Sequence, residues 1–152
     1  MESIWSRTSS ILQRPPLSED ARVDTVVIGG GMTGILAAFM LRRHGVEAIV
    51  LEAANIGSGQ TQNTTAKVTL QHGCIYGMLI DTFGIERARQ YARANQLAIE
   101  DYRMLIQEMS IDCEWKDCPA YLYSTLDAAP LEEEERAAHQ LGIGAALEQK
   151  IE

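Results

Sequence analysis

A glycine pattern at residues 29–34 (GGGMTG) limits the possible folds more than any other feature of the chain. It contains G-x-G-x-x-G, in which each glycine has a separate task. Gly29 permits a tight turn out of a strand, Gly31 lets the backbone approach a pyrophosphate, and Gly34 lets a helix pack close to the strand. The free N–H groups and the positive dipole end of that helix would face the phosphates. The pattern therefore predicts a dinucleotide site at the start of a helix.

The segments around the glycines predict the β-α-β unit that such a site needs. Residues 25–28 form a continuous β-branched run, which is typical of a strand buried on both faces of a parallel sheet. A helical apolar pattern follows and stops near Gly45, and residues 47–51 predict a second buried strand. The whole unit spans about 30 residues, the usual length.

Glu52 closes the second strand, 23 residues after Gly29. A carboxylate there accepts hydrogen bonds from ribose hydroxyls and repels a 2′-phosphate, which favours FAD or NAD over NADP. The alternative is a glycine-rich turn that binds nothing. This alternative is disfavoured because the strand, the glycine spacing, the helix and the acidic residue all match the pattern of a dinucleotide-binding unit.

Composition excludes several other classes. The chain has 152 residues, enough for about one domain with its own core. Its formal charge of −8, without a Lys/Arg cluster, argues against nucleic acid and against an anionic membrane surface. We expect neither a signal peptide nor a membrane span, and three cysteines without metal-ligand spacing indicate free thiols. We therefore expect a cytoplasmic protein with no metal site.

The rest of the chain predicts further helices and one strand pair. Pro15 and Pro16 indicate that residues 1–22 form an extended N-terminal segment, which leaves 23–152 for the domain that contains the nucleotide site. A long helix is expected over 85–109 and another over 131–141, the second with a solvated acidic first turn. Residues 111–125 predict two short strands.

The loop after Glu52 helps to decide between FAD and NAD as the cofactor. An NAD-binding half would run on soon into further β-α-β units, whereas residues 53–67 form a polar loop of small residues with a short helix expected around 63–68. Hydroxyls and backbone N–H groups of such a loop can hold phosphate and flavin oxygens without adding charge. A small NAD-dependent dehydrogenase is therefore the weaker alternative.

These segments resemble the DAO-type (glycine/D-amino-acid oxidase) flavoenzymes, above all the bacterial FAD-dependent oxidoreductases that carry a C-terminal Rieske domain. The similar parts are Ser3 and Trp5, the stretch 64–73 (TTAKVTLQHG), and residues 83–95. The resemblance implies an α/β fold: a Rossmann-like FAD-binding βαβ unit with additional helices and a short antiparallel strand pair, incomplete relative to the family. No Rieske ligand pair, C-x-H or C-x-x-H, is encoded.

The resemblance also implies a set of cofactor-binding residues. They are Gly29, Gly30, Gly31, Met32, Thr33, Gly34, Glu52, Ala53, Gln60, Thr61, Thr65, Ala66 and Lys67. Lys67 would stabilise negative charge on the reduced flavin ring, and a solvent-facing lysine is an equal alternative. For His72 we favour a structural role over a site role.

The function that follows is the FAD-binding portion of an oxidoreductase that oxidises a C–N bond of an amine or amino acid by hydride transfer to flavin. The partners expected are FAD and a small amine or amino-acid substrate, with association through exposed sheet edges. No catalytic base or substrate anchor is identified. The alternative is a non-catalytic nucleotide-binding chain or subunit that needs a further C-terminal part.

Overall fold

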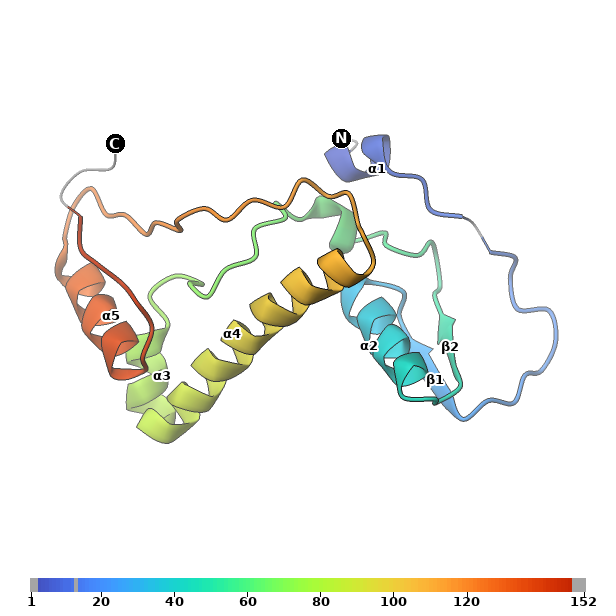
Figure 1. The fold of residues 1–152 in the computed structure, drawn as a ribbon, viewed down its shortest axis with the longest axis horizontal. Coiled ribbons are helices and arrows are strands. Elements are labelled where there is room, and N and C mark those ends of the chain that lie inside the picture. Colours follow the sequence, from blue (N-terminus) through green and yellow to red (C-terminus); the bar gives the residue numbers. More distant parts are fainter. Residues whose placement is uncertain (1–2, 13, 149–152) are drawn as a thin grey trace. The chain divides into compact units, whose positions relative to one another are not determined.

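The computed structural model describes residues 3–12 and 14–148 (Figure 1). The chain divides into two compact units, residues 1–67 and 68–152. This boundary lies inside the predicted domain 23–152, and the parts of both predicted segments at residues 1–2, 13 and 149–152 lie outside the described residues.

The first unit contains the predicted β-α-β unit. Strand β1 (Thr25–Ile28) and strand β2 (Ala48–Leu51) pair in parallel, with Thr25 opposite Ala48 and Ile28 opposite Leu51. Helix α2 (Met32–Arg43) connects them and packs on both strands (Figure 1). Both strands and the helix are confirmed, with β2 beginning one residue later than expected.

Gly45 ends α2 as the sequence predicts. It adopts a φ of +76°, the left-handed conformation that glycine takes without strain. The N–H of Gly45 donates to the carbonyl of Arg42, and the N–H of Val46 donates to the carbonyl of Leu41, both at 3.0 Å. This Schellman pattern satisfies carbonyls that the last helical turn leaves open and turns the chain toward β2.

The expectation of strands buried on both faces is wrong for this chain. Val26 is 48% exposed and Ile28 is 88% exposed, whereas the alternate residues of β1 are half-buried. Side chains of a strand alternate between the two faces of the sheet. Among the described residues, α2 is the helix that packs on this sheet, so the opposite face stays open to solvent.

The segments before β1 and after β2 depart from expectation in detail. A short helix, α1 (Ile4–Thr8), interrupts the predicted extended segment, because Ser3 caps it well upstream of the two prolines. The helix expected around 63–68 is instead a 3₁₀ turn, η1 (Thr61–Asn63). Thr64 leaves that turn with extended backbone, and Ala66 has a φ of +55°, so an α-helix cannot continue.

The second unit is a cluster of three helices: α3 (Tyr76–Phe83), α4 (Ile85–Glu108) and α5 (Ala129–Gln140). Helix α3 contacts both of the others (Figure 1). The core consists of one buried tyrosine and small or apolar neighbours: Tyr76, Ala88, Ala92, Ala137, Ala138 and Leu141. The two helices expected here are confirmed to within two residues at each end, and α3 was not predicted.

Two expectations in this unit are wrong. The acidic run 132–135 is not simply a solvated helix start, because Glu134 is only 5% exposed and binds the start of α3. Residues 111–125 form no strand pair, since this part of the described chain has no hydrogen-bonded strand partner and Tyr123 is 77% exposed. Instead, Arg103 holds the segment by binding Asp117 at 2.6 Å and lying over the ring of Trp115.

A search of the described helices for a segment long and apolar enough to cross a membrane finds none.

Candidate functional site

Glu52 joins the end of β2 to the glycine turn after β1. Its Oε2 accepts the N–H of Gly30 at 2.7 Å, and its Oε1 accepts the N–H of Ala54 at 2.9 Å. The hydrogen bond from Gly30, and then that from Ala54, holds the pKa of Glu52 below its ordinary value. The carboxylate is therefore ionised at neutral pH, and it faces the glycine turn that follows β1.

The glycine turn is too tight for side chains at two positions. A Cβ on Gly34 would lie 1.9 Å from the carbonyl oxygen of Gly29, so the first turn of α2 rests directly on the backbone leaving β1. A Cβ on Gly30 would lie 2.5 Å from Cδ1 of Ile56 and 3.0 Å from Cβ of Glu52. These contacts explain the glycines by close packing of helix, strand and loop.

The N-cap residue of α2 provides no side-chain cap. This residue is Gly31, which carries no side chain to occupy the helix end. The hydroxyl of Thr61 accepts the N–H of Met32 at 3.0 Å, and a Cβ on Gly31 would approach that hydroxyl to 3.2 Å. The site thus combines a helix N-terminus with a hydroxyl that still has its own proton to donate.

The loop between β2 and η1 closes over the glycine turn. The N–H of Gly57 donates to the carbonyl of Gly30 at 2.8 Å, and the Asn63 side chain donates to the carbonyl of Gly59 at 2.7 Å. Gln60 is the N-cap of η1, which places it next to Thr61. Backbone pairing therefore brings the loop and the glycines together without any charged side chain besides Glu52.

The predicted site residues fall into two groups. In the first group, Glu52 binds the glycine turn and Thr61 binds the start of α2. Ala53 follows Glu52 in the chain, and Gln60 precedes Thr61. Thr65, Ala66 and Lys67 follow η1 and are exposed, and no hydrogen bond among the described residues ties them to the glycine turn. His72 is exposed and belongs to the second unit. The assignment of these residues to FAD stays a prediction.

Sequence reasoning did not identify three residues that contact this site. Ile56 lies against Gly30, Ile11 lies against Gly57, and the indole Nε1 of Trp5 donates to the carbonyl of Thr64 at 2.8 Å. A signal existed for Trp5, because the Ser3/Trp5 pair stood out together with the 64–73 stretch. The sequence gives no such signal for either isoleucine, because an apolar residue in a loop can pack against many different parts of a protein.

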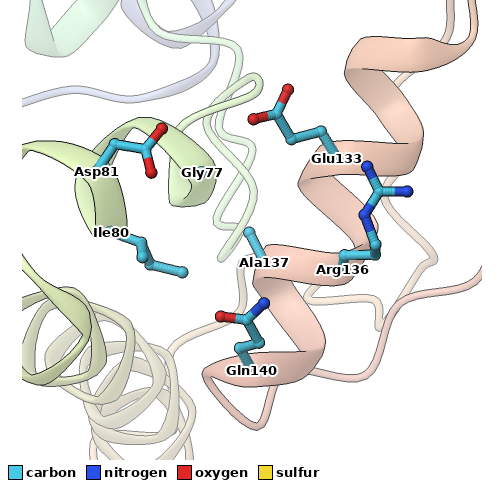
Figure 2. A pocket seen from close by; sticks show the side chains of 7 residues that line it. All are labelled: Gly77, Ile80, Asp81, Glu133, Arg136, Ala137 and Gln140. Atoms are coloured by element: carbon cyan, nitrogen blue, oxygen red, sulfur yellow. The ribbon is translucent and has the colours of Figure 1, made fainter.

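The second unit has a small hollow of its own between α3 and α5 (Figure 2). Its volume is about 230 Å³, and Ile80, Ala137 and Gln140 line it together with Asp81, Glu133 and Arg136. The hollow is open and mostly polar, unlike the enclosed apolar pockets that usually hold small molecules. No group of three or more potential metal ligands occurs in the described part of the chain.

Comparison with known proteins gives a family match over most of the chain. Residues 24–151 match the family described as DAO, FAD dependent oxidoreductase. The chain is 40% identical over 144 residues to YhfW of Bacillus subtilis, named as a Rieske 2Fe-2S iron–sulfur protein. That alignment covers 93% of this chain and 28% of the relative.

Two further relatives are oxidising enzymes by name. The chain is 27% identical to gamma-glutamylputrescine oxidoreductase of Escherichia coli, over 83% of this chain and 30% of the relative. It is 31% identical to flavin-containing amine oxidase A of Sus scrofa, over 57% of this chain and 16% of the relative. The chain therefore spans less than a third of the length of these relatives. No solved structure matches it significantly.

Proposed function

Because the chain belongs to the DAO family of FAD-dependent oxidoreductases, we propose that it forms the FAD-binding portion of an enzyme that oxidises a C–N bond. The observation that carries the proposal is the contact of Glu52 with Gly30, at 2.7 Å, beside the start of α2. The proposal assigns this carboxylate to the ribose and the neighbouring glycine turn to the pyrophosphate. We further propose that β1, α2 and β2 are the first unit of a Rossmann-like sheet.

The residues present fit FAD by their hydrogen-bonding capacity. An ionised carboxylate has about four acceptor positions. The N–H groups of Gly30 and Ala54 use two of them in Glu52, and the N–H of Ala53 also stabilises its charge, which leaves capacity for a ribose hydroxyl. Thr61 accepts from Met32 and can donate its own proton to a phosphate oxygen, while Gly31 leaves the space that a phosphate needs.

Bound FAD would supply the chemistry by accepting a hydride from the carbon of the C–N bond, and the residues of this chain would hold and tune it. Thr65, Ala66 and Lys67 would continue the site from the pyrophosphate toward the flavin ring. Lys67 would add a positive charge near the ring, and its exposure fits a solvent-facing role equally well. Replacement of Lys67 by Met, with the flavin reduction potential as the readout, separates these two roles.

An amine or amino acid is the proposed substrate. The support is the names of two relatives, a gamma-glutamylputrescine oxidoreductase and an amine oxidase. Because these relatives are oxidising enzymes, the alternative of a non-catalytic nucleotide-binding chain is not favoured. The proposal includes a cytoplasmic location, since Cys74, Cys113 and Cys118 are exposed free thiols that suit a reducing compartment. It also includes association through the outer edges of β1 and β2, which the described sheet leaves unpaired.

The test is the visible absorption of the purified chain after addition of FAD. We expect a yellow protein with bound flavin, and we expect an amine or amino acid to bleach it without oxygen. Replacement of Gly31 by Val should abolish FAD uptake, because its side chain would enter the space at the start of α2. Gly144→Val is the matched control, since a Cβ there meets open space. A chain that stays colourless with added FAD contradicts the proposal.

A further inference from the structure

The N-terminal segment covers the loop after β2 at three points. The indole Nε1 of Trp5 donates to the carbonyl of Thr64 at 2.8 Å. Cδ1 of Ile11 lies 2.8 Å from the position that a Cβ of Gly57 would occupy. In addition, α1 contacts η1. These contacts join the beginning of the chain to a loop that follows it by about fifty residues.

Hydroxyl groups hold Trp5 in place. A helix of five residues is too short to be stable by itself in water. Here Oγ of Ser3 accepts the N–H of Ser6 at 3.2 Å and caps the first turn. At the other end, the N–H and the hydroxyl of Ser9 both donate to the carbonyl of Trp5, at 3.0 and 2.6 Å. The backbone that carries the indole is therefore anchored at both ends.

The indole contact determines the direction of the next peptide group. A peptide unit is planar, so the carbonyl of Thr64 and the N–H of Thr65 lie in one plane and point in opposite directions. When Trp5 binds that carbonyl, the N–H of Thr65 can no longer rotate freely. Thr65 begins the exposed run 65–67, in which Ala66 has a φ of +55°.

We propose that Trp5 is a positioning residue for FAD, acting through the Thr64–Thr65 peptide. This inference rests on the proposed function, in which Thr65, Ala66 and Lys67 line the cofactor. Trp5 contributes by orienting a backbone donor before the cofactor arrives, and Ser3 contributes by capping the helix that carries Trp5. Preorganisation of this kind raises affinity because less backbone freedom is lost on binding.

The test compares Trp5→Phe with Trp115→Phe in the full chain. The first keeps an aromatic ring and removes the indole donor. The second is a matched loss of an indole in the other unit, where Nε1 of Trp115 donates to Asp117 at 3.3 Å. Binding is followed by titration with FAD, and the visible circular dichroism of bound flavin reports its surroundings. Thermal unfolding of the apoprotein reports structure alone.

We expect Trp5→Phe to weaken FAD binding about two- to tenfold, the effect of one lost hydrogen bond. It should also change the flavin circular dichroism, with an effect on apoprotein unfolding no larger than that of Trp115→Phe, and Trp115→Phe should alter neither FAD binding nor the dichroism. Ser3→Ala should weaken binding in the same direction and add little in the Trp5→Phe background, because both changes act on one contact.

The outcomes separate this inference from the proposed function. If the wild-type chain takes up no FAD, the proposed function fails and the role of Trp5 fails with it. If the wild-type chain binds FAD and Trp5→Phe gives the same affinity and the same dichroism, the role of Trp5 is overturned while the proposed function stands. If Trp5→Phe unfolds the apoprotein, Ser3→Ala replaces it in the FAD titration and the circular dichroism measurement. If Ser3→Ala then shows the same FAD affinity and the same dichroism as the wild type, the inference is overturned.

Discussion

Both carboxylate oxygens of Glu134 accept the backbone N–H of Tyr76, at 3.0 Å each, although the two residues are 58 positions apart in the chain. The same carboxylate accepts the N–H groups of Ile75 at 2.9 Å and Gly77 at 3.1 Å. A residue of α5 therefore caps the start of α3, where the first N–H groups of a helix have no partner of their own. The side-chain amide of Gln71 completes this arrangement at 2.7 Å.

Replacement of Glu134 by Gln should destabilise the second unit by about 1–3 kcal/mol, because the amide replaces one acceptor oxygen by an NH2 group in a site made only of donors. The measurement is urea unfolding followed by the fluorescence of Trp115, in a background where Trp5 is Phe. Glu132→Gln is the control, since Glu132 is an exposed member of the same acidic run. Equal stability of the two variants contradicts the capping role.

Tyr76 should ionise only in strong alkali. Burial is the main cause that raises its pKa from 10.0 to about 12, and Tyr91 and Glu134 add to the effect. Because the pKa of Tyr76 is raised in the folded chain, the protonated hydroxyl contributes to stability. This contribution is intact below pH 10 and is lost as the pH rises toward 12. Tyrosinate absorbance of the wild type should show a component near pH 12 that Tyr76→Phe lacks. Identical titrations of the two proteins would refute this assignment.

Replacement of Gly34 by Ala should destabilise the first unit by about 1–3 kcal/mol and abolish FAD uptake. The added methyl would lie 1.9 Å from the backbone of Gly29, and the carbonyl there cannot move without disturbing β1. The better helix propensity of alanine, about 1 kcal/mol, does not offset this overlap. Thermal unfolding and FAD titration check the prediction, with Gly144→Ala as the control. Normal FAD affinity in Gly34→Ala would show that the turn is not packed as described.

Glu52 should make the first unit sensitive to acid. Hydrogen bonds from Gly30 and Ala54 lower its pKa in the folded chain. Because the pKa is lowered in the folded chain, the ionised carboxylate contributes to stability above the ordinary pKa of 4.5. This contribution is lost as the pH falls through the pKa of the folded chain. The unfolding temperature of the wild type should therefore fall more steeply below pH 4.5 than that of Glu52→Gln. Parallel curves for the two proteins would mean that the carboxylate does not hold the glycine turn.

Local patterns were enough to predict the β-α-β part of the fold. The β-branched run 25–28 favours extended backbone, and the glycines permit the tight turn after β1 and the positive φ that ends α2, so β1, α2 and their boundaries follow from nearby residues. The sequence predicted an acid at the end of the second strand, and Glu52 follows β2 directly, while its bond from Gly30 was not predicted. The long helix α4 was predictable for a similar reason, because its apolar residues repeat at helical spacing.

Features that depend on a distant partner could not be predicted in this way. The strand pair expected over 111–125 has the right propensities but no partner strand in the described chain, and propensity alone does not form a sheet. Helix α3 was missed because its start is capped from α5 and not by its own sequence. The apolar spacing of Ile75, Leu79 and Phe83 before Gly84 was a signal for α3 that local reasoning passed over.

What the sequence alone determined is the β-α-β unit and its glycine turn, because each depends on residues within one short segment, and the family, because its motifs are matched along most of the chain. The tertiary structure decided that Glu134 is a buried cap and not a solvated acid, and that Trp5 binds Thr64. The physical reason is that a hydrogen bond between residues 58 or 59 positions apart depends on how the chain folds back, and no local spacing encodes that return.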